Sequence, residues 1–128
     1  MKPTVFLFGE SKKGEFATPV ACHSLTDLCH YFGDQEEDSL GISYAIQTLL
    51  YNKDLIFCRV HEEGFSRKDY MQGFSLLKQI KPFPYSQALF IPGVGDEELL
   101  EEAFNVCFLH KSLLVLTEKD LYDYLLSH

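Results

Sequence analysis

The sequence predicts an α/β fold in which a mainly parallel sheet is flanked by helices on both faces and carries an N-terminal hairpin arm. Short apolar runs alternate along the chain with segments whose apolar residues recur at helical spacing. This alternation is typical of strand–helix–strand units joined by right-handed crossovers. The chain has 128 residues, of which 46% are hydrophobic. That length and composition fit a single domain, residues 1–128, with a substantial core.

The first part of the chain is expected to form two extended segments and two helices. Residues 4–8 are a continuous apolar run ending at Gly9, as expected for a strand buried on both faces. Residues 16–22 indicate a hairpin arm, which Pro19 would confine to a sheet edge. Ser24 can cap a short helix that Gly33 ends. The apolar face of that helix would contain Leu25, Leu28, Cys29 and Phe32, and a second helix is predicted over residues 40–51.

Three rounds of strand and helix should follow. Strands are predicted over residues 55–60, 88–91 and 113–116, each followed by a capping residue: Ser66, Asp96 or Thr117. The helix after Ser66 is expected to run to about Lys81, because Pro82 and Pro84 prevent its continuation. Its inward residues would be Tyr70, Phe74 and Leu77. The helix after Asp96 should carry a broad apolar stripe made of Leu99, Leu100, Ala103, Phe104, Cys107 and Phe108.

Composition excludes several classes of partner. The net charge is −8, with acidic clusters in residues 34–38 and 96–102, so the surface should repel phosphate backbones and we expect no nucleic-acid binding. No apolar run approaches the length of a membrane helix, and the N-terminus lacks the features of a signal peptide. We therefore expect no membrane insertion, a cytoplasmic location, and four cysteines that are reduced and mostly buried.

Two glycine motifs suggest ligand binding at first sight. Gly9 and Gly14 have the spacing of a phosphate-binding P-loop, but Glu15 and Phe16 stand where that motif needs Lys and Ser or Thr. The second motif, residues 92–95 (PGVG), could offer backbone amides to an anion at a helix N-terminus. The acidic residues that start at Asp96 already occupy the positive end of that helix, so the glycines are interpreted as a structural turn.

Cysteine and histidine residues are the remaining candidates for a metal site or a nucleophilic site. The pairs Cys22-His23 and Cys29-His30 do not have the spacing of a zinc site, since the helix would turn Cys29 inward and His30 outward. A nucleophilic pair such as Cys22 with His61 stays open, because sequence does not show which residues meet in space. Arg59 is expected to pair with a carboxylate. The sequence thus assigns no catalytic, cofactor-binding or metal residues.

Several stretches, kept in order, resemble the core domain of contractile phage-tail sheath proteins. TVFLFGESKKGEFATPV looks like the sheath opening, and SLTDLCHYFGD looks like the sheath helix that ends in Phe-Gly. GISYAIQTLLYNKDLIFCRV is similar to the next sheath helix and its strand ending in Arg-Val. QALFIPGVGDEELLEEAFNVC looks like the sheath strand that ends in Pro-Gly before a helix. The resemblance covers nearly the whole chain.

This resemblance implies a non-catalytic structural or interaction protein, in a contractile or secretion-type assembly or a phage-like particle. Sheath subunits are typically longer and carry terminal arms, so this chain would be a minimal sheath-like protein, a component of a reduced contractile apparatus, or a descendant put to another use. Protein partners or self-assembly would use exposed sheet edges. The alternative is a small flavodoxin- or Rossmann-like domain that binds a ligand or performs thiol chemistry at the strand ends near Gly9, His61 and Gly93.

Overall fold

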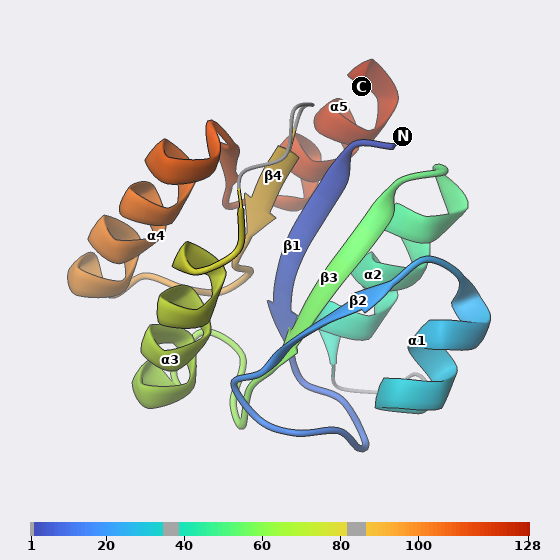
Figure 1. Cartoon of the computed structure of the whole chain (residues 1–128), viewed down its shortest axis with the longest axis horizontal. Coiled ribbons are helices and arrows are strands. Elements are labelled where there is room, and N and C mark those ends of the chain that lie inside the picture. The colour runs from blue at the N-terminus through green and yellow to red at the C-terminus, as the bar shows by residue number, and fades with distance from the viewer. Residues whose placement is uncertain (1, 35–38, 82–86) are drawn as a thin grey trace.

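The computed structural model describes residues 2–34, 39–81 and 87–128. Within these residues the chain forms a mixed five-stranded sheet with the order β2-β3-β1-β4-β5 (Figure 1). The strands are β1 (Thr4–Gly9), β2 (Pro19–Cys22), β3 (Asp54–Arg59), β4 (Gln87–Phe90) and β5 (Leu113–Val115). The pairs β1–β3, β1–β4 and β4–β5 are parallel, and only β2 runs antiparallel to its neighbour. The prediction of an α/β fold with a mainly parallel sheet is confirmed.

Local capping signals locate most of the helix starts. The helices are α1 (Leu25–Phe32), α2 (Leu40–Leu50), α3 (Arg67–Lys78), α4 (Glu97–His110) and α5 (Glu118–Ser127). The side chains of Ser24, Asp96 and Thr117 accept hydrogen bonds from first-turn amides, as predicted. Ser66 makes no such cap, because its hydroxyl oxygen accepts from the amide of Glu62 and the hydroxyl donates to the carbonyl of the same residue. Among the described helices, none has the length and hydropathy needed to cross a membrane.

The helix α3 ends before its predicted limit. Its last residue is Lys78, and the turn at Gln79 closes it, so the prediction that it reaches Lys81 is wrong. The two prolines that were expected to stop it, Pro82 and Pro84, lie outside the described residues. The inward positions are confirmed, since Tyr70, Phe74 and Leu77 are all buried.

The predicted hairpin arm is wrong. Strand β2 does not pair with β1; it lies antiparallel to β3, with Pro19 opposite Cys58 and Cys22 opposite Leu55. Both edges of β1 are occupied by the parallel neighbours β3 and β4, so the returning chain pairs one strand further out. The edge position that Pro19 predicted is confirmed. A proline lacks the N–H that a central strand must donate.

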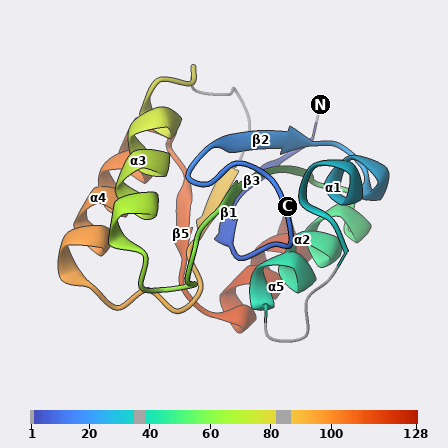
Figure 2. The same cartoon turned by 90° about the horizontal axis from the view of Figure 1, so that it is seen from below.

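Side chains of the central strands alternate between two hydrophobic clusters, as the pleat requires. Val5 and Leu7 belong to a cluster with residues of α1, α2 and α5, while Phe6 and Phe8 belong to a cluster with residues of α3 and α4. Figure 2 shows α3 and α4 lying together, away from α1, α2 and α5. The full burial of β1 explains why its sequence is an unbroken apolar run.

The apolar stripe predicted for α4 is split by the structure. Leu99, Ala103 and Cys107 are buried against the sheet, but Phe104 and Phe108 are 59% and 88% exposed. The helix covers β4 and β5, and the sheet ends at β5. The stripe is therefore wider than the surface available to bury it, and two aromatic rings remain on the outside.

A cap at the start of α5 should contribute measurably to stability. Thr117→Ala removes the side-chain oxygen that accepts from the amide of Asp120 at 3.2 Å. We expect the free energy of unfolding to fall by about 1 kcal/mol in urea denaturation. Thr117→Ser, which keeps the hydroxyl, is the control and should stay close to the parent. An equal loss in both variants would contradict a capping role.

Candidate functional site

The carboxyl ends of β1 and β4 mark the place where this fold would hold a ligand. The chain leaves β1 toward β3 on one side of the sheet and leaves β4 toward β5 on the other. Open α/β sheets bind ligands in the crevice outside the strand ends at such a switch point. The site predicted near Gly9, His61 and Gly93 therefore falls at this crevice.

The carboxylate of Glu63 occupies the amino end of α2 at this crevice. Its Oε1 atom accepts from the backbone amides of Glu10 at 2.9 Å and Gly41 at 2.8 Å, and lies 3.0 Å from the hydroxyl of Ser39. Its Oε2 atom accepts from the amide of Leu40 at 3.2 Å. The amide of Glu63 in turn donates to the Glu10 side chain at 2.9 Å. A side chain of the protein itself thus takes the place that an anion would take at a helix N-terminus.

Pairs of glycines let the loops approach closely enough for these bonds. A Cβ atom on Gly9 would lie 2.6 Å from the Cα atom of Gly41, so neither residue tolerates a side chain. Gly64 has φ +88°, and a Cβ atom there would lie 2.4 Å from the carbonyl oxygen of Gly93. The loop after β3 is therefore packed directly against the Pro92-Gly93 turn, across the ends of β1 and β4.

The second helix end at this crevice is also occupied from within. The side chain of Asp96 accepts from the amides of Glu98 and Leu99 at 2.9 and 3.1 Å, and Arg67 forms ion pairs with Asp96 and Glu98. Both helix N-termini that could receive an anion therefore carry carboxylates of the chain. This arrangement favours the interpretation of the PGVG segment as a structural turn.

Residues at the end of β3 form a stacked cluster. His61 Nδ1 lies 2.6 Å from Asp69 Oδ2, and the His61 ring stacks on Phe16 with centroids 3.5 Å apart. The Arg59 guanidinium lies 4.0 Å from the Phe16 ring centre and donates to the carbonyls of Ser11 and Gly14 at 3.1 and 2.7 Å. Among the described residues, the partners of Arg59 are thus carbonyls and a ring, and the expectation of a carboxylate is wrong. The cluster ties the 10–18 connection to the sheet.

The structure does not bring Cys22 and His61 together. Cys22 pairs with Leu55 at the start of β3, whereas His61 follows the end of that strand, about 20 Å away by strand geometry. Burial raises the pKa of Cys22 and of Cys107 to about 12, and it also raises the pKa of Cys58. These three thiols are therefore protonated and poor nucleophiles near neutral pH.

The buried face of helix α1 is narrower than predicted. Leu28 and Phe32 are buried, but Leu25 and Cys29 are exposed, so the expectation that Cys29 turns inward is wrong. His30 is exposed as expected, and His23 lies 3.0 Å from Asp54. In the described parts of the chain, no group of three or more His, Cys, Asp or Glu residues could hold a metal ion.

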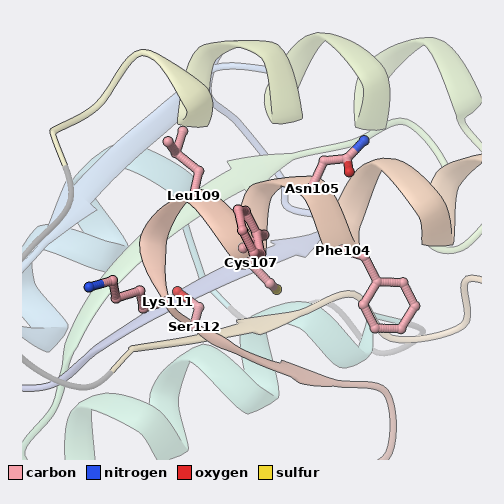
Figure 3. Close-up of a pocket in the computed structure, with 7 residues that line it drawn as sticks. Phe104, Asn105, Cys107, Leu109, Lys111 and Ser112 are labelled. Atoms are coloured by element: carbon pink, nitrogen blue, oxygen red, sulfur yellow. The ribbon is translucent and has the colours of Figure 1, made fainter.

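Among the described residues, β5 is the last strand on its side of the sheet and has no strand beyond it, so its outer edge is free. Beside it lies an open hollow of about 840 Å³, lined by Phe104, Asn105, Cys107, Phe108, Leu109, Lys111 and Ser112. Figure 3 shows this hollow, with Phe104 projecting from the α4 ribbon. The side chain of Leu113, at the start of β5, is itself 53% exposed. Sequence periodicity gave no sign of this surface, because it counted Phe104 and Phe108 in one stripe with the buried residues.

A second hollow lies beside β5, where α5 passes. It is lined by Leu113, Leu114, Val115, Asp120, Asp123, Tyr124, Ser127 and His128. The first hollow is formed by α4, which packs in the cluster of Phe6 and Leu114, and the second by α5, which packs in the cluster of Val115. The edge of β5 therefore has a hollow on each side, one on the exposed face of α4 and the turn that leads into β5, and one lined by β5 itself together with α5.

Comparison of the chain with protein-family models, with curated proteins and with solved structures found no match. The candidate site therefore rests on the geometry alone.

The Glu63 carboxylate should be a major determinant of stability. Glu63→Ala leaves the amides of Glu10, Leu40 and Gly41 without their acceptor, and we expect a loss on the order of 3 kcal/mol in the free energy of unfolding. Glu63→Gln keeps one carbonyl acceptor and should lose less. Glu62→Ala, at the exposed neighbouring position, is the matched control. Equal stability of Glu63→Ala and Glu62→Ala in urea denaturation would contradict this assignment.

The four thiols should differ sharply in reactivity. With a thiol-specific chromogenic reagent in native buffer we expect one fast phase, from exposed Cys29, and slow reaction of Cys22, Cys58 and Cys107. Cys29→Ser should remove the fast phase, and denaturation should release all remaining thiols. Fast labelling of Cys22 or Cys58 in the folded protein would show that a thiol is activated there.

Proposed function

We propose that this chain is a non-catalytic protein-interaction module that receives an extended segment of a partner at the free edge of β5. In this proposal it serves as a sheath-core-like component of a larger assembly, of the contractile or secretion type. The single observation that carries the proposal is the position of the β5 edge between two hollows. The carboxylates of Glu63 and Asp96, which occupy the two helix N-termini at the switch-point crevice, and the raised pKa values of the buried thiols weigh against the alternative of a small ligand-binding or thiol-dependent domain.

The two sheet edges are not equivalent as binding surfaces. Strand β2 begins with Pro19, which has no N–H to donate, and its residues Val20 and Ala21 are small. Strand β5 has no proline, and its free edge adjoins the exposed rings of Phe104 and Phe108. Proteins protect sheet edges in several ways, including very short edge strands, and β5 has three residues. The exposed aromatic rings beside it, rather than its length, therefore mark this edge as a place for strand addition.

An added strand would gain energy from two sources at β5. Its backbone would pair with the unpaired N–H and C=O groups along the free edge. Its side chains would cover Phe104 and Phe108, and full burial of each phenylalanine contributes on the order of 2 kcal/mol. Large exposed apolar patches on single domains commonly mark interaction sites. These gains make β5 the favoured edge.

Peptide selection tests the proposal directly. Linear peptides selected from a random displayed library against the immobilised protein should compete with one another for one site. Phe104→Asp and Phe108→Asp should each weaken their binding about tenfold or more, because exposed aromatics at the centre of an interface carry much of its energy. Leu25→Asp, a comparable exposed position on α1, is the control and should leave binding unchanged. A failure to recover binders, or binders that lose affinity only with Leu25→Asp, would contradict the proposal.

A further inference from the structure

The two hollows beside β5 differ in chemistry, and this difference indicates which side chains a bound segment would carry. We propose that the received segment is a strand in which apolar residues alternate with lysine or arginine. Its apolar side chains face α4, and its basic side chains face α5. This inference rests on the proposed strand addition at β5.

The alternation follows from the register of the sheet. Leu114 pairs with Leu89 and packs in the cluster that contains α4, whereas Val115 pairs with Phe90 in the cluster that contains α5. Residues directly opposite each other on neighbouring strands project to the same face. A residue opposite Leu114 would therefore project to the α4 side of the sheet, and its two neighbours would project to the α5 side, where all three residues of β5 line the hollow.

The α4 hollow selects for apolar residues. Phe104 and Phe108 are one helical turn apart, so their rings lie on the same side of the helix, and Leu109 is 41% exposed beside them. The charged residue that lines this hollow is Lys111, which would repel a basic side chain. An aliphatic or aromatic residue satisfies this surface, and a lysine does not.

The α5 hollow selects for basic residues. Asp120, Asp123 and Ser127 follow one another at helical spacing, all three are exposed, and all three line the hollow. Helix α5 carries three acids, Glu118, Asp120 and Asp123, against the single Lys119, which is not part of the lining; His128, which follows the helix, is also part of the lining. The chain as a whole has a charge of −8, so its field adds to the local attraction for a cationic segment.

The same charges disfavour a second copy of this chain as the occupant. A two-fold axis that paired two β5 edges would place one α5 beside the other, because the two sheets would become continuous. Asp120 and Asp123 of both copies would then face each other across the joint. The inferred partner is therefore a different chain, with a basic character on the face that meets α5.

Synthetic peptides with a common apolar pattern test this inference. One series carries Lys at the alternate positions, a second carries Glu and a third carries Ser, and binding is measured by calorimetric titration. We expect the Lys series to bind about tenfold more tightly than the Glu series at low salt, with the difference shrinking at high salt. Asp120→Asn/Asp123→Asn should remove most of this difference. The charge-matched control Glu15→Gln/Glu62→Gln should preserve it.

Methylation of backbone amides separates failure of this inference from failure of the proposed function. N-methyl groups on alternate amides block one edge of a peptide strand at a time, so one methylated form should lose binding and the other should keep it. Suppose that the Lys and Glu series bind equally and that their binding is still weakened by Phe104→Asp and by methylation. That result would overturn the proposed charge pattern and leave strand addition at β5 in place. Binding by none of the series, or binding that neither methylated form alters, would overturn strand addition at β5 itself.

Discussion

The hydrogen bonds of the Glu63 carboxylate hold together the carboxyl end of the sheet. Through these bonds, Glu63 in the loop after β3 contacts both Glu10, the residue after β1, and the amino end of α2. That contact requires glycine at positions 9 and 41, where the two backbones meet. It also places Gly64 against Gly93, so the loop lies across the switch point between β1 and β4. At the usual ligand position of an open α/β sheet, the amino end of α2 is therefore occupied by a side chain of the protein itself.

Carboxylates of the chain occupy the helix N-termini at the strand-end crevice, and the hollow that remains there, about 310 Å³, is lined by Gly64, Phe65, Arg67, Gly93, Gly95, Asp96 and Leu99. The outer edges of the sheet are the other candidate surfaces. The sheet ends at β2 on one side and at β5 on the other, and the chain protects these edges differently. Pro19 limits pairing at β2, while β5 lies between an apolar hollow on the exposed face of α4 and a hollow beside α5 whose lining includes Asp120 and Asp123. Exposed phenylalanines are costly to solubility unless something covers them. An edge that is apolar on one face and acidic on the other gives the proposed partner both affinity and a defined orientation.

Local signals in the sequence predicted most of the elements, because capping and periodicity depend on neighbouring residues. Ser24, Asp96 and Thr117 cap helices as predicted, and the apolar run at residues 4–8 is the central strand. Pairing over long distances was not predictable: β2 lies beside β3 because both edges of β1 are taken. Glu63 looked like any surface glutamate, and Phe104 was grouped with the core because the sequence does not show where a sheet ends. The resemblance to sheath proteins remains a prediction.

Amide hydrogen exchange, followed residue by residue with and without a bound partner segment, tests strand addition at β5 most directly. The account predicts that the outward-facing amides of residues 113–116 exchange rapidly in the free protein and become protected in the complex. Amides of β2 and of the loops around Glu63 should keep the same rates. Protection that appears at β2 or across the strand-end crevice, with β5 unchanged, would contradict the account.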